Sequence, residues 1–251
     1  MLKFFRYLRK QSLSENMAER SASKFSKYLL YAIGEIVLVV IGILIALQIN
    51  TWNESRLQSK KEKTILAGIH KEFAKNKKQL DSVVSQHKYV YYCTSKIIEL
   101  FPIRSKPEDK VLDSLSVYLY HSYGGLTYNP SQSSVNALTS TSSFDIISNE
   151  RLRNHLMTWN DLVEDYKEEE INARTYTNNE LDPYLSQHFD FFFDFKDPRN
   201  DFDALQSLEF EYKIRLINDL MNQILYTTGE LQLLQTTLDE IIDLSTPSRN
   251  D

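Results

Sequence analysis

The chain has 251 residues, a length that suits one domain of ordinary size plus a membrane segment. Glycine and proline are scarce, with six of each, so the composition forces few turns and favours a mostly helical protein. The one cysteine, Cys93, excludes an internal disulfide and a cysteine-based metal site within a single chain.

Charge is distributed unevenly along the sequence. Residues 1–27 contain seven basic and two acidic residues, and residues 51–101 contain ten basic and five acidic residues, so each segment has a net charge of +5. Residues 102–251 contain 12 basic and 26 acidic residues, which gives −14. The acidity of this distal part argues against nucleic acid as a partner, since phosphates need a basic surface. The basic segments flank an apolar stretch, where anionic lipid headgroups would lie.

The first 27 residues are predicted to form a basic head in the cytoplasm. Their opening stretch, MLKFFRYLRK, interleaves apolar and basic side chains. This composition suits a helix lying on lipid headgroups, and it suits a disordered basic tail equally well. Residues 11–24 are typical of a polar linker.

Residues 28–50 are predicted to form a transmembrane helix. The first 22 of them contain one charge, Glu35, and a helix of that length covers roughly 33 Å, enough for a bilayer core of about 30 Å. Tyr28 and Tyr31 at one end and Trp52 at the other fit the aromatic belts of the two membrane interfaces. The lipid bilayer is therefore the first partner that the sequence predicts.

This segment is predicted to be an uncleaved signal anchor. The sequence continues as LQINTWNESR and offers no small-residue cleavage site. The head is short and basic, and the C-terminal part is too long for its own charges to retain it, so we expect a single-pass protein with its N-terminus in the cytoplasm and its C-terminal domain outside. The asymmetry is modest, because four basic residues follow the span: Arg56, Lys60, Lys61 and Lys63.

Glu35 shares a helix face with two small residues. At about 100° per residue, Gly42 and Ala46 lie roughly 20° to either side of it, and their small-xxx-small spacing lets two helices approach closely in lipid. Two interpretations remain open. Glu35 is hydrogen-bonded to a partner helix in a homo-oligomer, or it marks the headgroup boundary, with the hydrocarbon core beginning at Ile36. A proton relay would need other ionisable groups in the span, and the sequence has none.

The membrane helix is predicted to continue outward as a stalk that ends at Phe101-Pro102. Apolar residues recur along it in alternating steps of three and four, at Leu66, Ile69, Phe73, Leu80, Val83, Val90, Ile97 and Phe101. Asn76, His87 and Thr94 fill the gaps on the same face. We expect His87 to be a packed or interfacial residue rather than a metal ligand.

Shorter elements are predicted after the stalk. Ser105 followed by Glu108 matches a capping box and predicts a helix to about His121. Residues 123–134 are rich in turn formers, and a short helix is predicted at about 131–140.

Two longer helices are predicted in the remainder of the chain. Asn149 and Glu150 open the first, whose apolar face consists of Leu152, Leu156, Trp159, Val163 and Tyr166. The run EDYKEEE at 164–170 is interpreted as a solvated helix face. The last helix is predicted at about 205–244, with apolar residues Leu216, Ile217, Leu220, Ile224, Leu231, Leu234, Leu238 and Ile241.

These amphipathic helices need one another to bury their apolar faces. We therefore predict an all-α protein in which one transmembrane helix continues into a long stalk helix and residues 51–244 form an extracytoplasmic antiparallel bundle. Residues 245–251 are expected to be a frayed tail.

The segment 189–203, FDFFFDFKDPRNDFD, interrupts the helical pattern and admits three interpretations. Its acids could offer oxygen ligands to calcium, although the spacing is not that of an EF-hand. Its phenylalanines Phe189, Phe191, Phe193 and Phe195 could instead pack on the bundle while the acids face water. The segment could also be a docking edge for a partner, since exposed aromatic patches often mark interfaces.

Three stretches of the sequence resemble an uncharacterised family of bacterial single-pass membrane proteins: KFFRYLRKQSLSENM, KYLLYAIGEIVLVVIGILIALQINTWNE and FDIISNERLRNHL. The resemblance is strong over the first sixty residues and loose over the rest. It implies a protein of the bacterial cytoplasmic membrane with a helical extracytoplasmic region, and it supplies no reaction, ligand or catalytic residue. Many members have a glycine near the turn at Ser142 and Ser143, and this chain has none there.

The sequence contains no recognisable catalytic motif. Glutamate does not stand three residues before any of the five histidines, so the di-iron pattern of helical bundles is absent, as are HExxH, GxSxG, the P-loop and the dinucleotide fingerprint. We predict no catalytic, cofactor-binding or metal-binding residues. The expected function is that of a non-catalytic interaction or sensory module, with an envelope scaffold as the alternative and an unrecognised periplasmic enzyme as a further one. Its partners would be a second copy of the chain and another protein, either in the envelope or at the cytoplasmic head.

Overall fold

The computed structural model of the protein describes residues 22–123 and 125–246, and of residues 22–27 only the backbone. These described residues form helices joined by loops, with no strand, which confirms the all-α prediction. Most of the predicted basic head and of the predicted tail lie outside the described residues. The chain divides into two compact units, residues 1–60 and residues 61–251, and each is described by itself.

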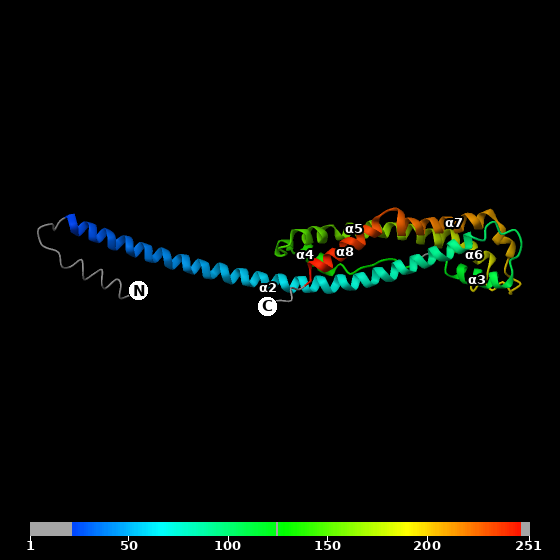
Figure 1. Ribbon diagram of the computed structural model, residues 1–251, viewed down its shortest axis with the longest axis horizontal. Coiled ribbons are helices and arrows are strands. Elements are labelled where there is room, and N and C mark those ends of the chain that lie inside the picture. Colours follow the sequence, from blue (N-terminus) through cyan, green and yellow to red (C-terminus); the bar gives the residue numbers. More distant parts are fainter. Residues whose placement is uncertain (1–21, 124, 247–251) are drawn as a thin grey trace. The chain divides into compact units, whose positions relative to one another are not determined.

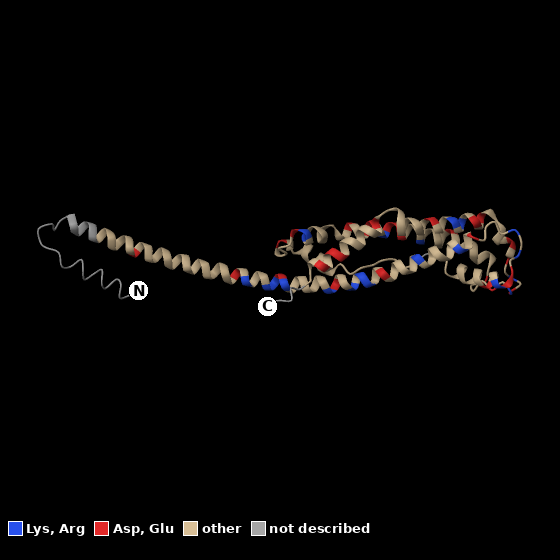
Figure 2. Ribbon diagram, viewed as in Figure 1, with Lys and Arg blue, Asp and Glu red and all other residues tan. Residues whose placement is uncertain are grey.

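The first unit contains the apolar part of α2 (Ala22–Ile98). Within the described residues, α2 is the one helix that is long and apolar enough to cross a membrane. Its apolar side chains between residues 28 and 50 are exposed on all sides, and charged positions are nearly absent there (Figure 2). A helix segment that is apolar all round and is not covered by any other described part of the chain has the properties of a lipid-facing span.

In the second unit, the remainder of α2 is one wall of a helical bundle. The predicted heptad face is confirmed, because its residues are buried, apart from half-buried Leu66 and Phe101: Leu66, Ile69, Phe73, Asn76, Leu80, Val83, His87, Val90, Thr94, Ile97 and Phe101. Asn76, His87 and Thr94 lie among these apolar residues, each with at most 1% of its surface exposed.

The helix predicted after the stalk is α3 (Asp109–Tyr120), but the predicted capping box is wrong. Glu108 is the residue that precedes the helix, and its side chain makes no capping hydrogen bond. Proline disfavours the helical conformation of the residue before it, so Pro107 prevents Lys106 from being the first helical residue after Ser105.

An extended return segment, residues 125–132, leads into α4 (Ser133–Ser140), which matches the short predicted helix. After α4 the backbone of Ser142 is left-handed, with φ 49°. This is the turn where the resembling family often has glycine, and glycine adopts such a conformation without steric conflict.

The long predicted helix is α5 (Glu150–Tyr176), and its predicted cap is confirmed because the Asn149 side chain accepts a hydrogen bond from the Leu152 N–H. Its five predicted apolar residues are all buried. The chain remains helical beyond α5 through a π-helical turn, η2 (Thr177–Leu181), and α6 (Asp182–His188).

The single helix predicted at about 205–244 is wrong, because the structure divides this region. A short 3-10 helix, η3 (Phe202–Gln206), precedes α7 (Leu208–Asn222), which a π-helical turn, η4 (Gln223–Thr227), extends. The chain then breaks at Gly229, whose φ of 81° is left-handed, and α8 (Glu230–Leu244) follows. The apolar spacing continues across the break, so periodicity alone predicts one helix.

Helices α2 and α5 run in the same direction, since contacts between them advance together along both. The Phe73 and Trp159 rings lie 4.8 Å apart, and further along both helices the Tyr166 hydroxyl lies 3.4 Å from His87 Nδ1. The return segment makes this possible, because it carries the chain back before α5 begins (Figure 1).

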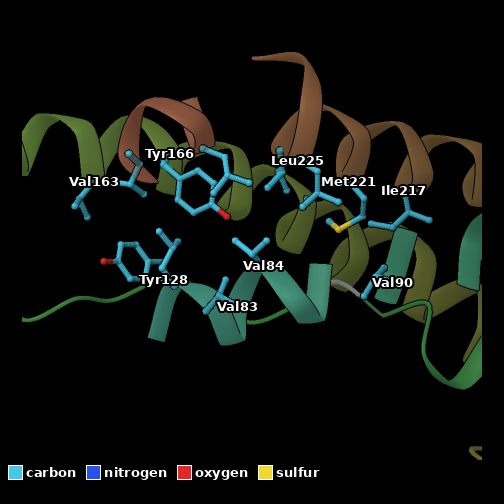
Figure 3. Close-up of a cluster of buried hydrophobic side chains, with 14 of the residues drawn as sticks. Val83, Val84, Val90, Tyr128, Val163, Tyr166, Ile217, Met221 and Leu225 are labelled. Carbon is cyan, nitrogen blue, oxygen red and sulfur yellow. The ribbon is translucent and has the colours of Figure 1, made fainter. Parts of the chain in front are cut away.

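Helices α7 and α8 run opposite to α2. The Asn218 side chain of α7 donates to Thr94 Oγ1 at 2.8 Å, near the end of α2, whereas His70, much earlier in α2, bonds to the Ile242 carbonyl of α8 at 3.0 Å. Side chains from all these layers meet in one apolar core, part of which is shown in Figure 3.

Candidate functional site

The residues predicted to form a helix–helix contact in the membrane all lie on the first part of α2. Glu35, Gly42 and Ala46 are exposed in the single chain. A Cβ atom added at Gly42 would meet no atom within 4 Å, so the surface there is open to another helix. The predicted oligomer contact therefore stays a prediction.

The predicted interfacial anchors lie on the same part of α2. Tyr28, Tyr31 and Trp52 are exposed, as residues in contact with lipid headgroups would be. Their positions at the two ends of the apolar stretch follow from the sequence, and their role as anchors stays a prediction.

A polar cluster is buried between α2, α5 and the return segment. His87 Nε2 donates to the Leu126 carbonyl at 2.9 Å, and Nδ1 of the same ring lies 3.4 Å from the Tyr166 hydroxyl. One oxygen of Glu170 accepts from the Tyr128 N–H at 2.7 Å, and the other lies 3.7 Å from His87 Nε2. The cluster thus holds an acid and a base, sealed from solvent.

Burial pushes this acid and this base toward their neutral forms. It raises the pKa of Glu170 to about 7, against the opposing effect of hydrogen bonds from the Tyr128 N–H and the Tyr166 hydroxyl. It lowers the pKa of His87, against the opposing effect of the bond to Leu126. The second Glu170 oxygen and the Tyr128 hydroxyl are buried with no hydrogen-bond partner in the protein. The cluster is therefore only partly satisfied, which makes it sensitive to substitution and to pH.

The position of Glu170 corrects the prediction that the run 164–170 is simply a solvated face. Glu170 is 3% exposed, whereas Glu164 in the same run is exposed. The spacing contained the signal, because Glu170 lies four residues after Tyr166 on the apolar face of α5. Its carboxylate can be buried because the return segment supplies a backbone N–H, a contact 42 residues away in sequence.

The return segment and the start of α4 are hydrogen-bonded to α2 at further points. Asn76 donates to the Ser131 carbonyl and accepts from the Ser131 N–H in the return segment. In α4, the N–H and the hydroxyl of Ser134 both donate to one oxygen of Glu72. Gly125 lies so close to the cluster that an added Cβ atom would be 2.5 Å from Cδ2 of the His87 ring. These contacts give the polar residues of the heptad face a structural role.

The other histidines also have local partners. His155 pairs with Glu240, and His188 Nδ1 lies 3.1 Å from an Asp201 oxygen. His121 contacts aromatic rings on either side. Across residues 22–123 and 125–246, no group of three or more His, Cys, Asp or Glu side chains is placed to hold a metal ion.

The acids of the 189–203 segment shape the loop itself. Asp190 accepts hydrogen bonds from the backbone of Phe192 and Asp194 and from the side chain of Asn200. Asp197 forms an ion pair with Arg199, which lowers the pKa of that carboxyl to about 2. With these oxygens already used, the loop is not arranged as an open calcium site.

The phenylalanines of the same segment have different environments. Phe189 and Phe193 are buried and Phe195 is half-buried, as the packing interpretation expects. For Phe191 that interpretation is wrong, because the Phe191 side chain is 72% exposed. Its neighbour Phe192 is 70% exposed. Alternating residues of a loop need not share one face, since the backbone turns at Phe193, whose φ is 55°.

Phe191 and Phe192 belong to an exposed aromatic patch. We define this aromatic patch as Tyr89, Tyr92, Val117, Tyr120, Phe191 and Phe192, which come from α2, α3 and the 189–203 segment and are each between 39% and 72% exposed. His121 connects them, with its ring centroid 5.0 Å from Tyr89 and 5.1 Å from Tyr120. Phe191 is 5.9 Å from Tyr120 and 5.2 Å from Phe192. Rings separated by a hundred residues of sequence thus form one continuous surface.

Two hollows on the surface lie away from the polar cluster and the aromatic patch. One, of about 230 Å³, lies between α2 and α8 and is lined by Lys77, Leu80, Asp81, Gln235, Leu238 and Asp239. The other runs along the side of α2 near Trp52, where a single helix provides every wall. Neither is lined by His87 or Glu170, so neither opens onto the buried acid and base.

Comparison with known proteins identifies a family. The model of a family of unknown function, DUF6090, matches residues 35–218, which include most of the apolar stretch of α2, the polar cluster and the aromatic patch. No curated protein and no solved structure shows significant similarity to the chain.

Proposed function

The chain belongs to the DUF6090 family of unknown function, and we propose that it is a membrane-anchored interaction module with no catalytic activity of its own. The apolar helix would hold it in the bilayer, and the helical bundle would present a binding surface. The observation that carries this proposal is the aromatic patch, since a contiguous exposed aromatic surface on a well-packed bundle is typical of a binding site.

The arrangement of the polar residues favours a binding role over an enzymatic one. A general acid or base needs to reach its substrate, and the Glu170 carboxylate is buried behind the return segment. The Asn76 side chain is hydrogen-bonded to that same segment, and one oxygen of Glu72 is bonded to Ser134 of α4. An enzyme remains the alternative of a different class, and it would require the return segment to open.

We further propose the bacterial cytoplasmic membrane as the location, with the N-terminus in the cytoplasm and the bundle outside. The short basic head supports this orientation. A reporter that is active only in the cytoplasm, fused to the C-terminus, should be inactive. Activity of that reporter would refute the orientation.

Within this function, a sensory role and an envelope scaffold differ in what the bundle binds. A sensory module would pass a signal to a separate cytoplasmic protein. A scaffold would bind envelope proteins. The polar cluster favours a condition-sensitive module, since burial raises the pKa of Glu170 to about 7.

Crosslinking in native membranes, followed by identification of the crosslinked proteins, tests the proposal. We expect homo-oligomers and at least one other protein. For the membrane contact, Gly42→Leu should weaken crosslinking between copies, with Val37→Leu, on the opposite face of the same helix, as the control. Absence of any crosslinked protein, together with a catalytic activity of the purified chain, would overturn the proposal.

A further inference from the structure

The aromatic patch is large for an apolar surface that a single chain exposes. At about 200 Å² per aromatic side chain, its exposed fractions correspond to about 600 Å² of mostly apolar surface, the upper end of the range found on typical monomers. A standard protein–protein interface covers about 800 Å² on each partner. The patch and the residues around it therefore have the size of one half of a stable interface.

The two edges of the aromatic patch carry opposite charge. On the α2 edge, residues 82–96 contain two basic residues and no acid; Lys96 is paired with Glu99, so Lys88 carries the positive charge of this edge. On the other edge, α3 contains two acids and one basic residue, and the 189–203 segment contains five acids and two basic residues, so this edge has a net charge of −4. The patch thus lies between a basic edge and an acidic one.

We propose that the aromatic patch is the contact surface for a second copy of this chain, in a two-fold symmetric dimer. In such a dimer the same patch is used by both copies, and each edge meets the opposite edge of the partner. The basic α2 edge of one copy then meets the acidic edge of the other, while the aromatic rings pack at the centre. Any other partner would need its own complementary apolar surface, whereas a second copy has it by symmetry.

This inference rests on the proposed function, because anchoring in one membrane places both bundles on the same side. Two copies anchored in one membrane point in the same direction across it, so the two-fold axis of their dimer lies along the membrane normal. Confinement to the membrane also raises their effective concentration, which favours a contact of modest intrinsic affinity.

The test uses the full chain in detergent micelles, with the dimer dissociation constant measured by sedimentation equilibrium. The variant Phe191→Ser/Phe192→Ser removes two exposed rings from the aromatic patch. The matched control, Leu208→Ser/Tyr212→Ser, removes two side chains on α7 that are 85% and 68% exposed and lie outside it. Far-UV circular dichroism confirms that both variants remain folded.

We expect the patch variant to raise the dissociation constant at least about tenfold and the control to leave it within about twofold, because central aromatic residues dominate interface energies. A charge exchange tests the pairing of the edges. Lys88→Asp and Asp113→Lys should each weaken the dimer, and the double variant should recover most of the affinity.

The possible outcomes test the dimer surface and the proposed function separately. A patch variant no weaker than its control overturns the inference, as does a wild-type chain that is monomeric at every concentration. If Gly42→Leu alone disrupts the dimer, or if another protein is crosslinked through the patch, the inference fails while the interaction module stands. A charge-exchanged double variant as weak as the single variants overturns the two-fold pairing of the edges.

Discussion

Replacing Glu170 by glutamine should stabilise the bundle at alkaline pH. Burial raises the pKa of Glu170 from an ordinary value of 4.5 to about 7, so the folded protein holds this proton more tightly than the unfolded chain does. Each pKa unit corresponds to about 1.4 kcal/mol, so ionised Glu170 reduces the free energy of unfolding by roughly 3 kcal/mol above pH 7. A neutral glutamine removes this effect, and its carbonyl can still accept the hydrogen bond from the Tyr128 N–H.

The sign of the pH dependence follows from the same values. Between pH 4.5 and about 7 the folded state binds more protons at Glu170, so this group makes stability fall as pH rises through that window. The charged and titratable groups that act on it are Tyr128 from the return segment, Tyr166 and Lys167 from α5, and His87 from α2. The pKa of His87 is lowered, so the folded state binds fewer protons at this ring than the unfolded chain does. The ring therefore makes stability fall as the pH falls below the ordinary pKa of histidine, 6.5.

The assay is urea unfolding of the detergent-solubilised full chain, followed by far-UV circular dichroism from pH 5 to pH 8. We expect Glu170→Gln to exceed the wild type by about 2–3 kcal/mol at pH 8 and by much less at pH 5. Glu164→Gln makes the same charge change at an exposed position of α5 and should leave the pH profile unchanged. The reasoning is refuted if Glu170→Gln is less stable than the wild type at pH 8, or if its pH profile parallels that of the control.

Five further substitutions, two of them controls, test the loops and caps by the same unfolding assay. Gly125→Ala should lower the free energy of unfolding by about 1–3 kcal/mol, because its Cβ would overlap a buried imidazole ring, whereas Gly68→Ala, in an open helical position, should raise it by up to about 1 kcal/mol. Equal effects of the two alanines would contradict the packing around the polar cluster. Asn149→Ala should lower the free energy of unfolding by about 1 kcal/mol through loss of the α5 cap, whereas Ser105→Ala should have no effect. An equal loss of stability at both positions would show that Ser105 does cap α3. Ser142→Gly should raise the free energy of unfolding by about 1 kcal/mol by relieving a left-handed backbone, and a destabilised variant would show that the turn is not left-handed.

The exposed apolar helix, the heptad face and the cap of α5 could be predicted because each depends on residues that are close in sequence. An apolar run is lipid-compatible whatever follows it, and Asn149 caps a helix that begins at the next residue. Burial at every third or fourth residue marks one face of a helix, so even polar Asn76, His87 and Thr94 could be placed on the buried face from their spacing.

The sequence pattern failed where backbone geometry overrides periodicity. The apolar spacing runs through Gly229, and only the left-handed backbone there shows that α7 and α8 are separate helices. Pro107 likewise prevents a helix start that the spacing of Ser105 and Glu108 suggests.

The amino-acid sequence by itself determined that this chain has an apolar helix and several amphipathic ones that must pack together. Only the tertiary structure decided which polar groups meet, because the partners are far apart in sequence: Glu170 bonds to Tyr128 across 42 residues and His87 lies beside Tyr166 across 79. The aromatic patch has the same origin, since Tyr89, Tyr120 and Phe191 are brought together only when α3 and the 189–203 segment dock beside α2. Periodicity encodes which side of a helix is buried, but it contains no information about which distant segment covers it.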